Sequence, residues 1–392
     1  MVSTEITLRI TDSIGNVAAG SWDACANPPA DRTEKISYNP FVSHDFLSAL
    51  ELSGSARNRT GWQPMHLLAE AADGKLVGAV PCYAKSHSQG EYVFDHGWAD
   101  AFERAGGNYY PKLQVAVPFT PATGPRLLAR PGAQAESVRN ALAEGLAEVC
   151  RRSRASSVHV TFLTEAEWRL LGACGYLQRT HRQFHWENPG YDSFDGFLGA
   201  LASRKRKTIR RERSDALADG ITVHWLSASD LTEGIWDAFF QFYMHTGSRK
   251  WGRPYLTRSF YSIVGEKMGD RILLVMAKRN GRWIAGAINF IGSDTLFGRH
   301  WGAIEHHPFL HFEVCYYQAM DYAIQHKLKR VEAGAGGQHK ILRGYMPATT
   351  YSAHYILDPG LRRAIADYLS HERAHVAAEI EEFAEAAPFR KE

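Results

Sequence analysis

The sequence contains few cysteines and lacks a long apolar segment. Its five cysteines are scattered over 392 residues, and no two of them form a C-x-x-C pair. This pattern argues against a disulfide framework or a zinc ribbon and is typical of a reducing compartment. No apolar run approaches the ~18 residues that a membrane-spanning helix needs. The opening residues, MVSTEITLRI, lack the basic and apolar regions of a signal peptide, so we expect a cytoplasmic protein without a membrane span.

An excess of charge of one sign is also missing, and so are several catalytic motifs. The 45 basic and 42 acidic residues leave a net charge of +3, so any electrostatic steering of a ligand must be local. The sequence has no G-x-S-x-G motif and no cysteine with a recognisable nucleophile context, and its histidine-rich segment at 300–313 lacks an H-E-x-x-H motif. Covalent catalysis therefore has no candidate residue, and we expect no metal site.

A repeated order of predicted elements indicates two related domains. Apolar hairpin patterns surround the turns Asp73-Gly74 and Asn280-Gly281, and each is followed by a helix and then a strand. The matching elements are hairpins at 64–83 and 272–290, helices at 135–151 and 312–326, and strands at 158–163 and 330–333. We interpret this order as a duplicated α/β domain, with mixed sheets flanked by helices.

A turn cluster at residues 188–190 (NPG) separates the two halves. We expect a first domain over residues 1–189 and a second, catalytic domain over 190–358. The second domain is predicted to open with one helix over 193–218. Residues 359–392 are predicted to form a C-terminal helix that packs back on the body.

The segment at residues 329–345, KRVEAGAGGQHKILRGY, has the strongest pattern for a binding site. A short strand leads into the glycines Gly334, Gly336 and Gly337, which are followed by His339, Lys340, Arg343 and Tyr345. Glycines let backbone amides approach a ligand closely, and a helix start adds partial positive charge. This geometry suits a carboxylate, a phosphate or a developing oxyanion. The alternative is a tight strand-to-helix turn with a solvated lysine.

A basic run at residues 203–213, SRKRKTIRRER, contains seven basic residues and one acidic residue. Like charges at Arg206 and Arg210 lie one helical turn apart and repel each other. A diphosphate, a nucleotide or an RNA backbone would relieve this repulsion. The alternative is an ordinary solvated helix face.

Three loops are further candidates for ligand contact. RKWGRPY at 249–255, with Arg249, Trp251 and Arg253, is typical of a ligand groove, although Trp251 packed under arginine stems is an equal alternative. The proline-rich loop at 109–125 indicates either a binding surface or local rigidity. The histidine-rich segment at 300–313 leads into a helix, so its amides are placed to meet a ligand phosphate.

Several long segments resemble one protein family. They are NPFVSHDFLSALE, GEYVFDHGWADAFERAGGNYYPKLQVAVPFTPATGPRLL, SRKRKTIRRER and HPFLHFEVCYYQAMDYAI, and they resemble the FemAB-like predicted N-acyltransferases, a family linked to peptidoglycan biosynthesis or recognition. The order of elements resembles the GNAT (acyl-CoA N-acyltransferase) fold, and two such units in one chain resemble FemAB-type aminoacyl transferases. The resemblance extends from about residue 22 to residue 373. It implies a tandem GNAT-like fold and transfer of an acyl or aminoacyl group to an amine.

The resemblance also implies roles for particular residues. In FemAB-type enzymes the second unit performs the chemistry, and a lysine in the pattern G-x-x-x-K-x-x-x-G helps to stabilise the transition state. That pattern falls here on Gly336, Lys340 and Gly344. The arginine-rich helix that opens the second unit falls on Arg206, Arg210 and Arg211.

The resemblance favours aminoacyl-tRNA as the donor. Acetyl-CoA-dependent enzymes carry Q/R-x-x-G-x-G/A before the pyrophosphate-binding helix, whereas this chain has GAIEHHPFLHFE, without the second glycine. The acceptor implied is an amine, either a small molecule or a peptidoglycan precursor, and no tightly bound cofactor is expected. The alternatives are an acyl-CoA-dependent N-acetyltransferase and a non-catalytic protein that binds a cell-wall precursor or RNA.

The chemistry of acyl transfer to an amine predicts a role for each of the remaining candidate residues. Lys340 and the amides near Gly336 and Gly337 are predicted to bind the oxyanion or a donor phosphate. His339 or Glu332 is predicted to take the proton of the amine. Arg343 and Tyr345 are predicted to orient the substrate, and the sequence does not indicate an oligomeric state.

Overall fold

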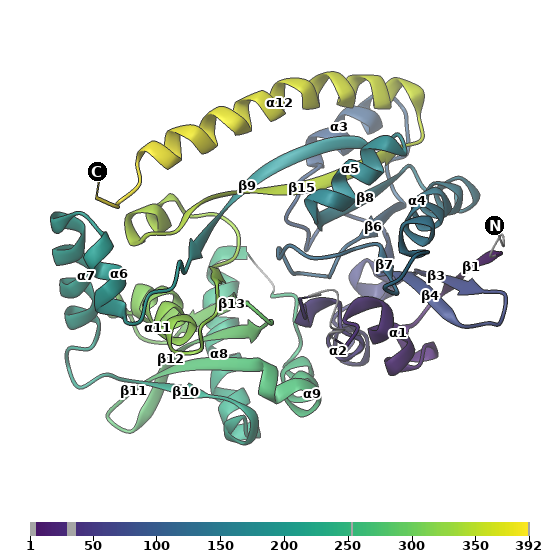
Figure 1. Ribbon diagram of the computed structural model, residues 1–392. Coiled ribbons are helices and arrows are strands. Elements are labelled where there is room, and N and C mark those ends of the chain that lie inside the picture. Colours follow the sequence, from purple (N-terminus) through teal and green to yellow (C-terminus); the bar gives the residue numbers. More distant parts are fainter. Residues whose placement is uncertain (1–4, 30–36, 252–253, 391–392) are drawn as a thin grey trace. The chain divides into compact units, whose positions relative to one another are not determined.

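The computed structural model describes residues 5–29, 37–251 and 254–390 (Figure 1). The chain divides into two compact units, which are described separately. Unit 1 comprises Met1–His181 and Thr349–Ala378, and unit 2 comprises Arg182–Ala348 and Glu379–Glu392. These limits differ from the predicted boundaries at 189 and 358 because two long strands and the C-terminal helix each have residues in both units.

Unit 1 contains two β-sheets and five helices of its own among the described residues. Its strands are β1 (Ile6–Thr11), β2 (Trp62–Pro64), β3 (His66–Ala71), β4 (Leu76–Val80), β5 (Cys82–Lys85), β6 (Lys112–Val115), β7 (Leu128–Ala129) and β8 (Ser157–Leu163). Its helices are α1 (Ala19–Ala26), α2 (His44–Leu52), α3 (His96–Arg104), α4 (Ala135–Arg152) and α5 (Glu165–Ala173). One sheet has the order β1-β3-β4-β7 and is antiparallel. In the other, β6 and β8 run parallel.

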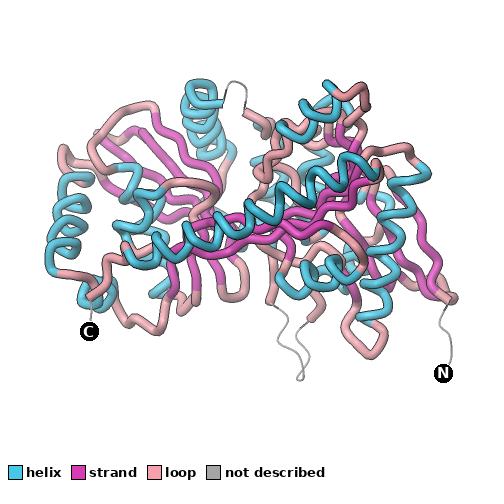
Figure 2. Tube along the Cα trace, turned by 90° about the horizontal axis from the view of Figure 1, so that it is seen from above, coloured by secondary structure: helices cyan, strands magenta, loops and turns pink. Residues whose placement is uncertain are grey.

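Unit 2 is built on one sheet with the order β10-β11-β12-β13-β14-β9. Its strands are β10 (Thr222–Leu226), β11 (Ile272–Arg279), β12 (Arg282–Ile291), β13 (Thr295–Ala303), β14 (Arg330–Glu332) and the end of β9 (Leu177–Glu187). Its helices are α6 (Phe194–Ala200), α7 (Ser203–Ala216), α8 (Glu233–Trp251), α9 (Arg258–Met268), α10 (Leu310–Phe312) and α11 (Gln318–Gln325). α8 covers one face of this sheet, and α11 covers the other (Figure 1; Figure 2 shows the same chain turned by 90°).

The two units repeat one order of elements. Each has an antiparallel hairpin, β3–β4 or β11–β12, and a parallel pair, β6–β8 or β13–β14, whose second strand follows a helix. After each parallel pair come a short helix and an 11-residue strand, β9 in the first half and β15 (Met346–Ile356) in the second. The predicted duplicated α/β fold, with mixed sheets flanked by helices, is confirmed.

The two long strands are exchanged between the halves of the sequence. β9 follows α5 in the first half, and its last residues pair with β14 in unit 2. β15 follows the second half, and its later residues pair with β8 in unit 1. The C-terminal helix α12 (Pro359–Glu385) begins in unit 1 and ends in unit 2.

Both predicted hairpin turns are confirmed, and their backbone angles explain the residue choice. Asn280 and Gly281 have φ values of 49° and 77°, the left-handed pair that a two-residue type I′ turn requires. Gly74 has a φ of 78° in the first hairpin. Ser43 is the N-cap of α2, because its Oγ accepts a hydrogen bond from Phe46 N at 3.2 Å.

Two sequence-based predictions about local structure were wrong. The single helix predicted over 193–218 is interrupted at Leu201, which is extended, fully buried and bridged to Phe389. The backbone bridge to Phe389 and the burial of the Leu201 side chain stabilise the extended conformation more than a continuous helix would be stabilised. The proline-rich loop at 109–125 contains the buried strand β6, and Tyr109 is fully buried, so its predicted role as a binding surface is wrong.

Within the described ranges, no helix combines the length and the apolar content that crossing a bilayer requires.

Close packing of α8 on β13 generates a stability prediction. An ideal Cβ on Gly302 would lie 2.2 Å from the backbone C and O atoms of Phe242 in α8. Because neither backbone can give way easily, we expect Gly302→Ala to lower the free energy of unfolding by about 1–3 kcal/mol, the range of overpacking substitutions. Chemical denaturation measures this change.

Gly199→Ala in α6 is the matched control. An ideal Cβ at Gly199 meets no atom within 4 Å, and the residue is helical. We expect its stability to be unchanged or slightly raised. Equal midpoints for the two variants would contradict the described packing of α8 against β13.

Candidate functional site

The site begins where the parallel strands β13 and β14 diverge. They pair only at Thr295–Phe297 with Arg330–Glu332, after which β13 continues to Ala303 and β14 ends. The register between β12 and β13 shifts at the same place, because Asn289 faces Gly298 while Ile288 faces His300. Arg299 is therefore a bulge residue. Beyond Phe297, no strand of the described residues pairs with β13 on the β14 side, and an opening forms there.

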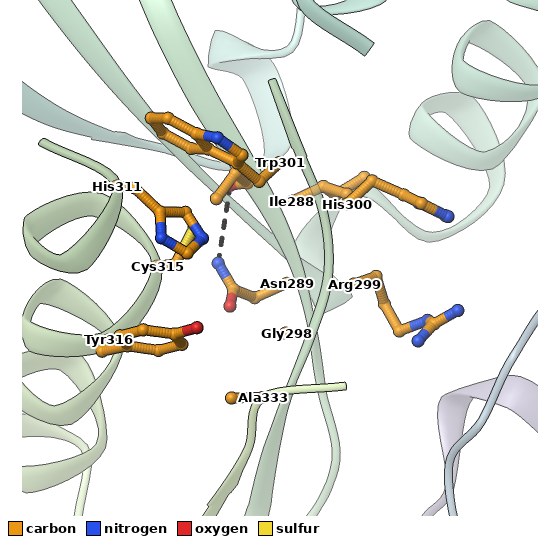
Figure 3. Close-up of a pocket in the computed structure, with 11 residues that line it drawn as sticks. Ile288, Asn289, Gly298, Arg299, His300, Trp301, His311, Cys315, Tyr316 and Ala333 are labelled. Carbon is orange, nitrogen blue, oxygen red and sulfur yellow. Dashed lines mark hydrogen bonds between the residues drawn. The ribbon is translucent and has the colours of Figure 1, made fainter. Parts of the chain in front are cut away.

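A cavity of about 90 Å³ occupies this opening (Figure 3). It is lined by Ala287, Ile288, Asn289, Gly298, Arg299, His300, Trp301, His311, Cys315, Tyr316 and Ala333. In Figure 3 the side chains of Asn289, His311 and Tyr316 converge, whereas those of Arg299 and His300 point away from them. Of the described residues that line the cavity, none carries a carboxylate.

Asn289 places one polar atom of a fixed side chain in the cavity wall. The residue is 1% exposed, and its Nδ2 donates to the carbonyl oxygen of Leu273 at 3.2 Å. Its Oδ1 accepts no hydrogen bond from the described part of the chain and lies 3.2 Å from the point where a Cβ of Gly298 would be. An N–H or O–H group in the cavity would therefore find a ready acceptor.

A π-helical turn forms the opposite wall. α10 passes directly into a π-helix over Glu313–Tyr317, which closes with Gln318 N donating to Glu313 O, and α11 follows. The Glu313 carboxylate is held by Arg213, with Nη2 to Oε1 at 2.9 Å and Nε to Oε2 at 3.1 Å. Such single π-turns are frequent at functional sites, and this one contains Cys315 and Tyr316, which line the cavity.

Tyr316 connects the cavity to His339. The hydroxyl of Tyr316 lies 3.0 Å from Nε2 of His339, which is otherwise exposed. Burial raises the pKa of Tyr316, so the hydroxyl is protonated at neutral pH. The pair therefore forms a path for a proton between the cavity and the outside imidazole.

Lys340 lies behind the cavity wall. Its side chain is 2% exposed, and Nζ donates to the carbonyl oxygens of Ala333 at 2.8 Å and Gly334 at 3.0 Å. Burial lowers the pKa of Lys340 to about 8. The ammonium does not line the cavity, but it fixes Ala333, which does.

The side chains of Arg343 and Tyr345 contact other residues of unit 2. Arg343 donates to Glu212 Oε1 at 2.7 Å and to the carbonyl oxygen of His339 at 2.8 Å, and its guanidinium lies over the ring of Phe312. Tyr345 is fully buried, with its ring 5.4 Å from that of Tyr316. Neither residue lines the cavity. Arg343 instead holds the backbone that carries His339.

The glycine turn after β14 has the backbone geometry that the sequence indicated. Gly334, Gly336 and Gly337 have φ values of 69°, 74° and 94°, all left-handed. The following helix is a short 3₁₀ segment, Gln338–Arg343. Glu332 is buried at the end of β14, with Oε2 4.0 Å from His185 Nε2, and it does not line the cavity. Burial lowers the pKa of His185 to about 3.

A larger groove of about 600 Å³ adjoins the cavity through Trp301 and His311. It is lined by His245, Thr246, Trp301, Ala303, Ile304, Glu305, His306, His307, Phe309, Leu310, His311 and Phe312. The histidine-rich loop that the sequence singled out therefore forms one wall of a groove. Among the described residues, no three His, Cys, Asp or Glu side chains are arranged to hold a metal ion.

Most of the basic run lies on the exposed face of α7, but Arg213 points inward to Glu313. Arg210 pairs with Asp195 at 2.9 Å and Arg211 with Asp215 at 3.5 Å, at largely exposed positions where such pairs are weak. Arg206 has no acidic partner among the described residues. Of the predicted segment at 249–255, Arg253 lies outside the described residues, and only the backbone of Arg249 and Trp251, at the end of α8, is described.

Sequence reasoning did not select Asn289, Trp301, Cys315 or Tyr316 as site residues. Their proximity depends on a strand bulge and a π-turn, and neither has a reliable local sequence pattern. The HFEVCYY segment, directly after the histidine-rich loop, was the one available signal.

Three solved structures are similar to this chain in fold. FemX is 12% identical, with 92% of this chain and 100% of FemX covered and a TM-score of 0.54. L-PGS from Bacillus licheniformis is 10% identical over 86% of this chain and 99% of its own, with a TM-score of 0.50. A tandem GNAT protein from the clavulanic acid biosynthesis pathway is 13% identical over 91% of this chain and 99% of its own, with a TM-score of 0.44.

At identities this low, FemX and L-PGS show a shared fold and nothing more, and no argument rests on the third structure. No curated protein sequence matches the chain. A family model described as peptidoglycan biosynthesis/recognition matches residues 13–391, which is nearly the whole chain. The protein is therefore a member of the FemAB-like family.

Proposed function

We propose that this protein transfers an acyl or aminoacyl group from an activated ester to an amine of a peptidoglycan precursor, and that unit 2 carries the site. The observation that carries this proposal is the opening between β13 and β14, where a bulged strand borders a cavity without carboxylates. Membership of a family linked to peptidoglycan biosynthesis supports the choice of acceptor.

The edge of β13 suits the charge that develops during acyl transfer. A tetrahedral intermediate places negative charge on the former carbonyl oxygen, and preorganised N–H donors stabilise it strongly in a site that excludes water. Between Gly298 and Trp301, β13 has no strand partner on the β14 side in the part of the chain that the structure describes. We assign its backbone N–H groups on that side to the oxyanion. The Lys340 ammonium, held behind Ala333, adds positive potential.

Tyr316 and His339 suit removal of the proton from the attacking amine. The Tyr316 hydroxyl lines the cavity and lies 3.0 Å from His339 Nε2. The hydroxyl takes a proton from the amine while passing its own to the imidazole, which is exposed and releases it to water. Asn289 Oδ1 is placed to accept an N–H of an aminoacyl group, a contact that a plain acetyl group lacks.

The loop before α10 does not fit the pyrophosphate of coenzyme A. Pyrophosphate sites of this type need several free backbone N–H groups at a helix start. Here Pro308 has no N–H, and Leu310 N is directed at the carbonyl oxygen of His307 at 3.4 Å. Glu305 adds a carboxylate to the groove wall. We therefore favour aminoacyl-tRNA as the donor and derive no step through coenzyme A.

A mass-resolved donor screen tests the proposed reaction. The intact protein is incubated with an amine acceptor and either a set of aminoacyl-tRNAs or a set of acyl-CoAs. We expect an amide product with aminoacyl-tRNA and none with acyl-CoA. A product formed only from acyl-CoA would contradict the donor assignment, and tight binding without any product would indicate a binding protein.

Lys340 generates a prediction of rate and pH dependence. Lys340→Met removes the charge and the hydrogen bonds to Ala333, which lines the cavity, and to Gly334. We expect kcat/KM to fall by about 10- to 100-fold, the cost of a small misplacement or a lost electrostatic contact. Because the pKa of Lys340 is about 8, the group is cationic below that pH and neutral above it. The wild-type rate should therefore decline as pH rises through about 8, and the variant should lack this decline.

Lys329→Met is the control for this prediction, because Lys329 is exposed in the same unit. Its rate and pH profile should match those of the wild type. A descending limb that persists in Lys340→Met would show that another group causes it.

The basic face of α7 generates a prediction about RNA. Arg206→Gln with Lys207→Gln removes two charges that lack acidic partners among the described residues. If these residues contact phosphates, the affinity of the variant for total tRNA is lower than that of the wild type. The plot of the logarithm of the binding constant against the logarithm of the salt concentration becomes less steep, by about 0.7–0.9 for each lost contact. Filter binding over a salt series measures both quantities.

Arg169→Gln in α5 of unit 1 is the matched control, since Arg169 is an exposed helical arginine outside the proposed surface. An equal loss of affinity in both variants would indicate non-specific charge attraction only.

A further inference from the structure

One cysteine differs from the other four in its surroundings. Cys25, Cys82 and Cys150 are buried, and burial raises the pKa values of their thiols to about 11, 12 and 11. Cys174 is partly exposed in unit 1, where burial and nearby Glu144 raise its pKa. Cys315 alone among the five lines the cavity of the candidate site.

We propose that Cys315 accepts the acyl group from the donor as a thioester and then passes it to the amine. The reaction would be a double displacement with a covalent acyl-enzyme. This inference rests on the proposed function, because it concerns the same cavity and the same acyl group. It also replaces the expectation from sequence that covalent catalysis has no candidate residue.

The π-turn directs Cys315 into the cavity. Cys315 is the central residue of the segment Glu313–Tyr317. Its neighbour Glu313 is fully buried and fixed by Arg213, and Gln318 Nε2 donates to the same carboxylate at 2.7 Å. The buried Glu313–Arg213 ion pair fixes the backbone of this turn, and the Cys315 thiol is therefore held at the cavity wall.

A base lies on the same helical face. His311 precedes Cys315 by one helical turn, at the i, i+4 spacing that places two side chains side by side, and both line the cavity (Figure 3). A cysteine next to an imidazole is a recurrent arrangement for an activated thiol nucleophile. The ring of His311 is kept in place by Trp301 and Tyr316, with ring centroids 5.2 and 5.3 Å away.

The electrostatic surroundings favour a thiolate. Reactive cysteines occur in partly exposed, electropositive environments, and Cys315 is partly exposed. None of the described cavity-lining residues is acidic. Burial lowers the pKa of Lys340, and a negative charge on Cys315 acts in the opposite direction, so the ammonium and a thiolate stabilise each other.

The cavity is of a size to hold a small acyl group. Its volume of about 90 Å³ is smaller than the ~150 Å³ cavity that accommodates benzene. Asn289 is 1% exposed, and its Oδ1 accepts no hydrogen bond from the described residues, so it supplies a buried polar group with an unused site inside this space. A cavity this small holds the acyl group and one reacting partner at a time, which favours transfer in two steps.

The two steps balance without a further reactant. His311 takes the proton of the Cys315 thiol, sulfur attacks the ester carbonyl, and the tetrahedral intermediate expels the donor hydroxyl, which receives that proton. The products of this step are the thioester and the free donor alcohol. The amine then attacks the thioester, the C–N bond forms and the C–S bond breaks. The amine proton leaves through Tyr316 and His339, and the thiolate is protonated again.

Acyl-enzyme trapping tests the inference. The full-length protein is mixed with alanyl-tRNA or, as a probe that needs no RNA recognition, with p-nitrophenyl acetate, in the absence of an amine. We expect a burst of about one equivalent of alcohol, with the acyl group mapped to Cys315 by peptide mass spectrometry and released by hydroxylamine. Addition of an amine to the isolated adduct should give the amide. An adduct that does not pass to the amine would overturn the inference.

Cys315→Ala and Cys174→Ser are the paired variants. Cys315→Ala should form no adduct and lose transfer by at least about a hundredfold, as expected when a nucleophile is removed, while Cys174→Ser should match the wild type. If Cys315→Ala transfers the acyl group within about twofold of the wild-type rate, the amine attacks the donor directly, and the proposed function stands without the thioester. If the wild type forms no amide with any donor, the proposed function itself fails.

A reagent experiment covers the case in which Cys315→Ala does not fold. Alkylation of the wild type with iodoacetamide should abolish transfer in proportion to modification of Cys315, and alanyl-tRNA should slow that modification. Full activity after complete alkylation of Cys315 would refute the covalent role.

Discussion

The short pairing between β13 and β14 is the constraint on which the candidate site depends. The parallel pair ends after three paired positions, so the backbone N–H and C=O groups that follow cannot bond to a neighbouring strand. Buried backbone groups without a hydrogen-bond partner lower the stability of the folded state. The Lys340 side chain compensates for part of this loss, because its ammonium donates to the carbonyl oxygens of Ala333 and Gly334, directly after β14.

The same position in unit 1 has been filled. β6 and β8 also form a parallel pair, but polar side chains bond to one another across it, with Gln114 Nε2 donating to Thr161 Oγ1 at 2.9 Å. At the start of β6, Lys112 is fully buried and bonded to Glu91 at 2.8 Å and to Asp95. Buried ion pairs add little net stability but are costly to break. The parallel pair of unit 1 is thus joined by a side-chain hydrogen bond, whereas that of unit 2 borders a cavity.

The sequence predicted those features that local residue patterns determine. Asn280-Gly281 and Asp73-Gly74 indicate tight hairpins because few residues tolerate left-handed backbone angles, and the glycines after β14 have such angles for the same reason. The duplicated order of elements followed from hydrophobic periodicity. Leu201 shows the limit of this reasoning. Its neighbours favour a helix, and its partner Phe389 lies far away in the sequence.

The cavity residues were not predictable in the same way. Cys315 and Trp301 belong to an ordinary helix pattern and an ordinary strand pattern, and only a register shift and a π-turn bring them together. Lys340 was identified from its segment, but the direction of its side chain depends on two carbonyl groups that become accessible only because β14 ends early. Local pattern thus located the region, and long-range packing determined which atoms face the cavity.

The exchange of β9 and β15 has a consequence for synthesis on the ribosome. The edge of β8 is covered by residues 351–356 of β15, which follows every other named strand in the sequence. While the second half is being translated, the first half therefore carries an open sheet edge, a feature prone to association with other chains. Nascent chains of this protein are expected to need a chaperone, or a slow approach to completion, until the final strand emerges.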